Sequence, residues 1–382
     1  MMANKVVAIV MAAGLSSRMK QFKPLLPLGG VSALERVVRT FREAGVTDVR
    51  VVIGHRHEEL EPVIESLGVR PVLNRRHREG MFSSVTAGIN TIDPEADAFF
   101  VQPVDVSLVR AATIRRLLQV YRQSRADLLY PCFLGRRGHP PLIAGRHAKA
   151  IASWGGAGGL RAVLARWEQT ALEVAVADDL ILCDMDTPDA YQSLAARAER
   201  LGIPSQAECR ALLTLLGVEE QIIRHGREVA RVAAELGERL NRAGFHLDLP
   251  LLAAAGLLHD LARHKPDHAL AGARLLRELD FGAVADLVAS HMDIVFSFQE
   301  PINAAAVLFL ADKLVNGDQS VSLTERFRAA LERYADQPEI IRMVRDRLAT
   351  AQNIQQRLES ILGLPLVEML TPVAPAIIKH AS

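Results

Sequence analysis

The sequence lacks any long hydrophobic run and contains little cysteine. No apolar stretch approaches the ~20 residues that a helix needs to cross a bilayer, and the apolar run near the N-terminus is too short for a signal peptide. The three cysteines, Cys132, Cys183 and Cys209, follow no metal-ligand spacing and argue against a disulfide framework. We therefore expect a cytoplasmic protein with no membrane partner.

The sequence also lacks an excess of charge of either sign. Its 45 Lys and Arg residues balance its 44 Asp and Glu residues, which leaves a formal net charge of +1. Because no overall field would attract nucleic acid, we expect no nucleic-acid partner, and any cationic site is local. The chain has 382 residues, 49% of them hydrophobic, which exceeds one typical core and predicts two domains.

The N-terminal stretch joins a buried strand to a polar loop. Residues 6–11 form a short apolar run, and the small residues after it let backbone N–H groups approach an anion. The loop residues of interest are Ala12, Ala13, Gly14, Ser16, Ser17, Arg18 and Lys23. The G-x-x-x-x-G-K-[ST] and G-x-G-x-x-G patterns are both absent. We interpret the stretch as a phosphate-binding loop, with an ordinary Gly- and Ser-rich turn as the alternative.

Strand and helix patterns alternate through the first half of the chain. A helix is expected over 33–44, a strand over 49–53, a helix over 58–67 and a strand over 69–73. This order predicts a Rossmann-like α/β domain with a parallel sheet covered on both faces. Gly80, Ser83 and Ser84 would add N–H and O–H donors at a helix N-terminus, on the carboxyl edge of that sheet.

Polar residues follow three later segments of this half. Asp105 ends an apolar strand over 98–104, a typical position for a Mg²⁺ ligand, although it could also cap the next helix. Arg137 and His139 lie in the segment GRRGHPPL and could bind a polyanionic acceptor or form a solvated hairpin tip. In the segment DMDTP, Asp186 and Thr187 are able to cap a helix over 189–201.

Several of these motifs resemble one family of transferases. The residues AAGLSSRM, a following lysine and LPLGG are similar to the opening signature of the nucleotidyltransferases, especially the molybdenum cofactor cytidylyltransferases. GMFSSVTAGI resembles the second nucleotide motif of that family, and GRRGHP resembles its acceptor-side element. Asp105 begins a segment similar to the metal motif D-x-P-L, with Ser107 in place of proline. DMDTP resembles the D-x-D-T-P motif, which implies that Asp186, with Asp184 in reserve, is a second metal ligand.

The resemblance implies a reaction for residues 1–202. CTP would react with a phosphorylated molybdopterin, giving a cytosine dinucleotide and pyrophosphate. Arg18 and Lys23, with Mg²⁺ on the two carboxylates, would stabilise the charge. Guanylyl transfer, or another phosphorylated acceptor, is the nearest alternative, and Ala13 favours cytidine. A nucleotide-binding regulator or chaperone of a molybdoenzyme is a hypothesis from another class.

The composition changes at about residue 203, where strand patterns end and a helical periodicity begins. We expect an all-α domain over 203–382. It contains ionisable residues on separate apolar helices, which is costly unless they are paired or bind a metal. These residues are His225, His259, Asp260, His268, His291 and Asp312. For any single histidine, a hydrogen-bonded core residue is the simpler interpretation, but the set gives a complete shell of N and O ligands for a divalent metal.

The order of these ligands resembles the HD-domain metal-dependent phosphohydrolases over about residues 207–315. His225, His259, Asp260 and Asp312 match the H, HD and D positions of that superfamily. His268 and His291 match extra histidines of dinuclear members, which implies a second ion. The resemblance therefore implies hydrolysis of a phosphoester or phosphoanhydride with Mn²⁺, Fe²⁺ or Mg²⁺, although catalytically silent members also occur.

Overall fold

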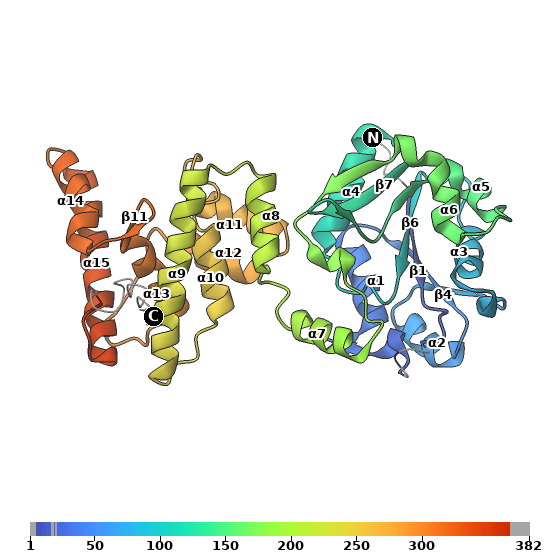
Figure 1. The fold of residues 1–382 in the computed structure, drawn as a ribbon, viewed down its shortest axis with the longest axis horizontal. Helices are drawn as coiled ribbons and strands as arrows, with labels where there is room; N and C mark the ends of the chain where they lie inside the picture. The colour runs from blue at the N-terminus through green and yellow to red at the C-terminus, as the bar shows by residue number, and fades with distance from the viewer. Residues whose placement is uncertain (1–4, 17–18, 20, 367–382) are drawn as a thin grey trace, which may run out of the picture. The chain divides into compact units, whose positions relative to one another are not determined.

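The computed structural model describes residues 5–16, 19 and 21–366, and it divides into two compact units (Figure 1). The units are Met1–Leu201 and Gly202–Ser382. The first is an α/β structure and the second is helical, which confirms the predicted fold class. Among the described residues, no helix is both long enough and apolar enough to cross a membrane.

A twisted sheet forms the centre of the first unit, with the strand order β10-β7-β9-β6-β1-β4-β5. Its strands are β1 (Val6–Met11), β4 (Asp48–Ile53), β5 (Arg70–Leu73), β6 (Ala98–Pro103), β7 (Leu128–Phe133), β9 (Leu142–Ala144) and β10 (Leu172–Ala175). The short strand β8 (Arg136–Arg137) pairs with β7, and β2 (Pro27–Leu28) pairs with β3 (Val31–Ser32) in a separate ribbon. Strands β1 and β6 are almost wholly buried, as their apolar sequences require.

The sheet is not entirely parallel, which differs from the prediction. Strands β5, β4, β1 and β6 pair in parallel, but β9 runs antiparallel to both β6 and β7. Residues 134–141 separate β7 from β9 by a short connection, and only an antiparallel strand can follow so closely. The predicted βαβαβ order holds where helices of normal length connect the strands.

Helices cover both faces of this sheet. They are α1 (Ala33–Glu43), α2 (His57–Ser66), α3 (Met81–Ile89), α4 (Ala111–Ser124), α5 (Ala148–Ala152), α6 (Gly159–Leu164) and α7 (Pro188–Ala198). Helices α1 and α4 pack together, and α3 packs with α5 and α6 (Figure 1). At Gly88, α3 lies so close to β1 that a Cβ atom would come within 2.5 Å of Ile9. This close contact holds the C-terminal turn of α3 against β1.

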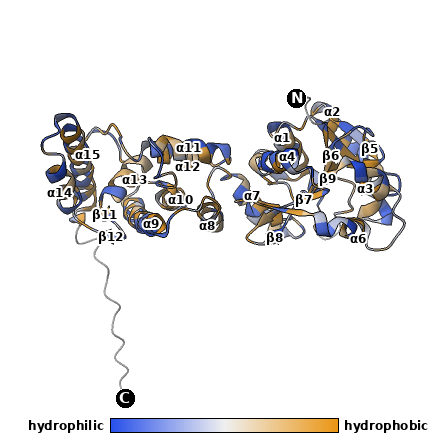
Figure 2. Cartoon of the chain, turned by 90° about the horizontal axis from the view of Figure 1, so that it is seen from above, coloured by the Kyte–Doolittle hydropathy of each residue, from blue (hydrophilic) through white to orange (hydrophobic). Residues whose placement is uncertain are grey.

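The second unit consists of packed helices with one small hairpin. The helices are α8 (Gln206–Leu215), α9 (Glu220–Arg242), α10 (Leu249–Leu258), α11 (His268–Glu278), α12 (Gly282–Ser290), α13 (Ala304–Lys313), α14 (Leu323–Arg333) and α15 (Pro338–Leu362). The hairpin of β11 (Val315–Asn316) and β12 (Gln319–Ser320) was not expected from the sequence. It turns at Gly317, whose positive φ of 62° suits glycine. Figure 2 shows hydrophilic and hydrophobic residues sharing the surface of α9, as expected of an amphipathic helix.

Candidate active sites

A cavity of about 320 Å³ lies at the carboxyl ends of β1 and β6 in the first unit. This is the edge of an α/β sheet where ligands normally bind, and the volume is within the usual range for small-molecule sites. Of the predicted residues, those that line it are Ala12, Ala13, Gly14, Ser16, Lys23, Gly80, Ser84, Asp105 and Asp186. The chain thus brings together residues that are up to 174 positions apart, from Ala12 to Asp186.

Lys23 is the central charged residue of this cavity. Its side chain is buried, and its Nζ atom lies 3.2 Å from Asp105 Oδ2 and 2.5 Å from Asp186 Oδ1. Neither carboxylate serves as a helix cap, because Arg110 precedes α4 and Thr187 caps α7. The two carboxylates therefore converge on one point inside the cavity, where a cation already binds them.

The loop after β5 forms another wall of the cavity. Asn74 is buried, and its Nδ2 donates to Ser84 Oγ at 2.8 Å and to Ser83 Oγ at 2.9 Å. The Ser83 hydroxyl lies 2.8 Å from the Gly80 carbonyl and 2.9 Å from the Arg76 carbonyl, to which it can donate. Ser84 lines the cavity, whereas Ser83 is not among its described lining residues. Ser83 thus holds the loop, and Ser84 faces the ligand space.

Two lining residues of this loop, His77 and Arg78, were missed in the sequence interpretation. Nothing in the local sequence pattern shows which side chains of this polar stretch face inward. A Cβ atom on Gly54 would come within 2.7 Å of His77, so this glycine permits the loop to approach β4. His77 and Arg78 therefore give the cavity a basic wall in addition to its two carboxylates.

Arg137 and His139 do not line the described part of the cavity. Arg137 lies on β8, where it forms ion pairs with Glu168 at 2.5 Å and Glu173 at 2.7 Å. His139 is exposed by surface area, yet neighbouring atoms desolvate its ring enough to lower its pKa. Asp105 and Asp184 oppose this shift, which places His139 near the carboxylate side of the site. Ser17 and Arg18 lie outside the described residues.

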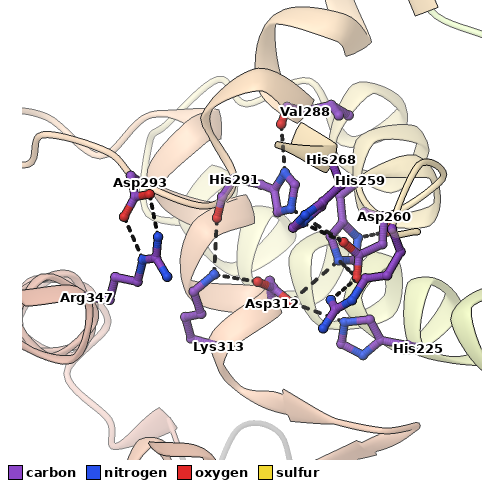
Figure 3. Close-up of polar contacts among 12 residues, drawn as sticks. His225, His259, Asp260, His268, Val288, His291, Asp293, Asp312, Lys313 and Arg347 are labelled. Atoms are coloured by element: carbon purple, nitrogen blue, oxygen red, sulfur yellow. Dashed lines mark hydrogen bonds and ion pairs between the residues drawn. The ribbon is translucent and has the colours of Figure 1, made fainter. Parts of the chain in front are cut away.

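The second unit gathers its predicted ligands into one buried cluster (Figure 3). His225 comes from α9, His259 and Asp260 follow α10, His268 begins α11, His291 follows α12, and Asp312 lies in α13. Two groups have ligand atoms within 4.8 Å of one another. One contains His225, His259 and Asp260, and the other contains Asp260, His268 and His291. Asp260 belongs to both groups, so it is placed to bridge two positions.

Backbone carbonyls orient three of the histidines. His225 Nδ1 lies 2.8 Å from the Gly317 carbonyl, His259 Nδ1 lies 2.8 Å from that of Gly256, and His291 Nδ1 lies 2.7 Å from that of Val288. An Nδ1–H that donates to a carbonyl leaves Nε2 as the free ring nitrogen. In each case Nε2 faces a carboxylate, at 3.2–3.6 Å. The unexpected β11–β12 hairpin therefore has a clear role, because it supplies the carbonyl that orients His225.

Four buried polar atoms at this cluster lack a hydrogen-bond partner among the described residues. They are His259 Nε2, Asp260 Oδ1, His268 Nε2 and His291 Nε2. Unsatisfied buried polar atoms are costly, and these four point toward the same space. Histidine nitrogens and carboxylate oxygens are the donors that divalent transition metals prefer. The donor set thus fits one divalent ion in each group.

The charges of the cluster are consistent with ionised carboxylates. Burial alone would raise the pKa of Asp260, but the nearby imidazoles of His259, His268 and His291 hold that pKa well below its usual range. Burial also opposes ionisation of Asp312, whose pKa is lowered mainly by the neighbouring Lys313 ammonium. Two anionic carboxylates are therefore available to ligate a cation.

Two basic residues that contact these carboxylates were not identified from the sequence. Arg263 Nη1 donates to Asp260 Oδ2, and its side chain is half exposed. Lys313 is buried, and its Nζ donates to Asp312 Oδ2 at 2.5 Å and to the His291 carbonyl at 3.2 Å. The sequence offered one clue to each residue, its spacing: Arg263 follows Asp260 by three residues, and Lys313 directly follows Asp312. Nothing in their residue type distinguishes them from surface cations.

Comparison with known proteins identifies a domain in each unit. Residues 8–174 match the family model described as a MobA-like NTP transferase domain, and residues 222–317 match the HD domain. These matches confirm the two resemblances found in the sequence. The chain therefore contains both domains in this order.

Two curated relatives each match about three tenths of this chain. The bifunctional protein GlmU of Syntrophomonas wolfei is 27% identical over 124 residues, covering 32% of this chain and 27% of GlmU. A bifunctional IPC transferase and DIPP synthase of Rubrobacter xylanophilus is 38% identical over 118 residues, covering 29% of this chain and 26% of that protein. The chain thus spans about a quarter of the length of these relatives.

A solved nucleotidyl transferase from Methanothermobacter thermautotroptrophicus is also similar. It is 24% identical, with a TM-score of 0.47, and the match covers 52% of this chain and all of that structure.

Proposed function

We propose that this chain, which joins a MobA-like NTP transferase domain to an HD domain, transfers a nucleotidyl group with its first domain and hydrolyses a phosphate ester or anhydride with its second. The domains are assigned to residues 1–202 and 203–382. The observation that carries the transferase proposal is the convergence of Lys23, Asp105 and Asp186 on one cavity at the carboxyl edge of the sheet.

The transfer is an in-line displacement at phosphorus. An oxygen of the acceptor phosphate attacks the α-phosphorus of the nucleotide, and the bond from that phosphorus to the pyrophosphate oxygen breaks. The small residues Ala12, Ala13 and Gly14 allow the triphosphate to approach the loop backbone, and Lys23 balances charge on the leaving pyrophosphate. Asp105 and Asp186 would hold Mg²⁺, which supplies further charge stabilisation when it is bound.

The specific substrates proposed are CTP and a phosphorylated molybdopterin. The motif resemblance supports this choice, and the basic wall with His77 and Arg78 is suited to a phosphorylated acceptor. Guanylyl transfer, or another small phosphorylated acceptor, is the alternative within the same chemistry. A role as a regulator or chaperone for a molybdoenzyme apoprotein is the alternative without turnover.

A panel of the four nucleoside triphosphates with Mg²⁺, with and without molybdenum cofactor, tests the transferase proposal. We expect pyrophosphate release to be fastest with CTP and to require the acceptor. Asp105→Ala should abolish release, whereas Asp93→Ala, which changes an exposed aspartate outside the cavity lining, should not. Binding of nucleotide without pyrophosphate release under every condition would favour the regulatory alternative.

The four unpartnered buried atoms carry the proposal for the second domain. His225, His259, Asp260 and Asp312 would hold one ion, and His268 and His291, sharing Asp260, would hold a second. Mn²⁺, Fe²⁺ and Mg²⁺ are the ions proposed, and a bound ion of this kind supplies an activated water. The protein's own groups orient the ligand nitrogens through backbone carbonyls and exclude bulk water through burial of the cluster.

Metal analysis and a phosphohydrolase screen of the full chain test this second proposal. The parent, loaded with each ion, should hydrolyse at least one nucleotide or phosphate ester, and Asp260→Ala should lose both metal and activity. If the parent retains no ion and is as inert as Asp260→Ala, the domain is a structural or regulatory module.

A further inference from the structure

A second cavity in the helical unit lies next to the metal-binding cluster. It has a volume of about 160 Å³, roughly half the ~300 Å³ at the lower end of ordinary ligand pockets. It therefore suits a single ring system and not a whole nucleotide. Its lining comes from residues 293 and 294 after α12, from Phe309 on α13 and from one face of α15. Helix α15 lies beyond residues 222–317, the part that matches the HD domain, so this wall is an addition to the matched core.

Two walls of this cavity continue into segments that carry the proposed metal ligands. Asp293 follows His291 by two residues, and Phe309 precedes Asp312 by three, about 4.5 Å along the axis of α13. The Lys313 Nζ atom lies 4.7 Å from the centre of the Phe309 ring and 2.5 Å from Asp312 Oδ2. A ligand in the cavity would thus lie close to a phosphate bound at the cluster.

The polar groups of the cavity determine what kind of ring it can bind. Arg347 is the cation of the lining, and its Nε and Nη2 atoms both donate to Asp293 at 2.7 Å (Figure 3). Thr350 donates its hydroxyl proton to the Asp346 carbonyl at 3.0 Å. The Asp346 side chain, in contrast, is exposed and makes no hydrogen bond or ion pair among the described residues. The site therefore offers a free carboxylate acceptor and no free cation for a phosphate.

The apolar part of the lining complements such a ring. Ile294 and Met343 provide an aliphatic and a thioether surface, and the Phe309 ring, which is almost fully buried, lies behind them. Flat heteroaromatic rings pack favourably on sulfur-containing side chains. An exocyclic amino group on the same ring would donate to the unpartnered carboxylate, as amino groups of bases do to Asp and Glu elsewhere.

We propose that this cavity binds the base of a nucleotide substrate of the HD domain and selects bases that carry an exocyclic amino group, such as cytosine or adenine. The proposal rests on the proposed hydrolase function, since the substrate phosphate would bind at the metal cluster. Asp346 is the specificity residue, and α15 is the element that supplies it.

The test compares Asp346→Asn with the parent in the full-length, metal-loaded protein. The substrates are CMP, UMP and p-nitrophenyl phosphate, which has no base. We expect the variant to lower kcat/KM for CMP relative to UMP by about tenfold or more, mainly through KM, because an amide oxygen replaces a charged acceptor. Hydrolysis of p-nitrophenyl phosphate should stay unchanged. The matched control is Asp336→Asn, an exposed aspartate outside the cavity lining.

Two results would overturn the proposal. One is an Asp346→Asn variant that matches Asp336→Asn on all three substrates. The other is an equal loss on all three, which would mean that Asp346 acts through the metal cluster. If the parent hydrolyses none of them, the hydrolase proposal fails for these substrates, and equilibrium binding of cytidine and uridine decides about the cavity. Tighter binding of cytidine that disappears in Asp346→Asn supports it, and equal binding refutes it.

Discussion

Lys23 occupies the position between Asp105 and Asp186 that a divalent cation would take. Its ammonium group is buried and bonded to both carboxylates, so metal binding has to displace it. We expect Lys23→Met to strengthen binding of Mn²⁺ or Mg²⁺ to the nucleotide-free protein by about tenfold, because a competing charge is removed. The same change should slow pyrophosphate release by about 10²-fold, since charge on the leaving group is no longer balanced.

Lys5→Met is the matched control for this prediction. Lys5 also pairs with two carboxylates, Glu95 at 3.0 Å and Asp93 at 4.0 Å, but on the exposed surface outside the cavity lining. Metal titration calorimetry and a pyrophosphate assay measure the two effects. Weaker metal binding by Lys23→Met would show that the lysine organises the carboxylates and does not compete for them.

Asp127 is a residue whose contribution depends on pH. Hydrogen bonds from His147, Thr170 and Arg146 lower its pKa from 3.8 to about 2, although desolvation opposes them. A carboxyl with a lowered pKa stabilises the folded state above its unfolded pKa and loses this effect as the pH falls toward the folded value. We expect Asp127→Asn to cost about 1–2 kcal/mol near neutral pH and progressively less between about pH 4 and pH 2.

Tryptophan fluorescence during urea unfolding can measure this difference. Both tryptophans, Trp154 and Trp167, lie in the first unit, and the His147 ring contacts the Trp167 ring at an angle, with centroids 4.0 Å apart. Asp93→Asn, at an exposed position, serves as the control. A loss of stability that is the same at both ends of the pH range would show that the carboxylate charge does not matter.

At the scale of elements, the crossing of α9 and α10 positions the first two histidines of the proposed metal site. A Cβ atom on Gly256 would come within 2.6 Å of the Ala230 backbone, and one on Gly226 within 2.7 Å of the Leu257 carbonyl. These glycines let the helices approach closely beside His225 and His259. We expect Gly256→Ala to separate the helices, lowering stability by about 1–3 kcal/mol and metal content together.

Gly272→Ala in α11 provides the comparison for this prediction. Its added Cβ would meet its nearest neighbour, Val288, at an ordinary 3.5 Å. This variant should keep its metal and gain slightly in helix propensity. Metal analysis together with thermal unfolding measures both outcomes, and equal behaviour of the two variants would mean that the helix crossing tolerates an extra methyl group.

The elements differed in how well the sequence predicted them. Strand β1 and the histidine-bearing helices followed from apolar runs and helical periodicity, because burial fixes such patterns. Strand β9 and the β11–β12 hairpin were not predicted, because strands of two or three residues are too short to show a recognisable periodicity. The carboxylates and histidines were recognisable as polar residues in apolar surroundings. His77, Arg78 and Arg263 were not, because surface cations are common and only tertiary contacts show which of them face a site.

At the scale of the whole molecule, both domains use the same electrostatic arrangement. In the first, Lys23 neutralises two carboxylates, and in the second Arg263 and Lys313 each neutralise one. Buried or half-buried carboxylates without a counter-ion would be costly, so a basic side chain lets each site fold before a metal binds. If a metal took over this role at the proposed sites, Lys23 and Arg263 would become available to anionic phosphates. Each proposed site thus carries both the metal ligands and a cation for the substrate.

Because the two units have separate cores, removal of metal from the HD domain should affect only one unfolding transition. Tryptophan fluorescence reports on the first unit alone, whereas far-ultraviolet circular dichroism also follows the helices of the second. We expect a chelator to lower the unfolding temperature of the second unit by roughly 5–10 °C, which is the effect of losing an ion present at about 100 times its Kd. The unfolding transition followed by fluorescence should stay unchanged. Asp260→Ala should start at the lower temperature and no longer respond to the chelator. If a chelator instead lowered the fluorescence transition of Asp260→Ala by a similar roughly 5–10 °C, the stabilising ion would lie in the first unit, at Asp105 and Asp186.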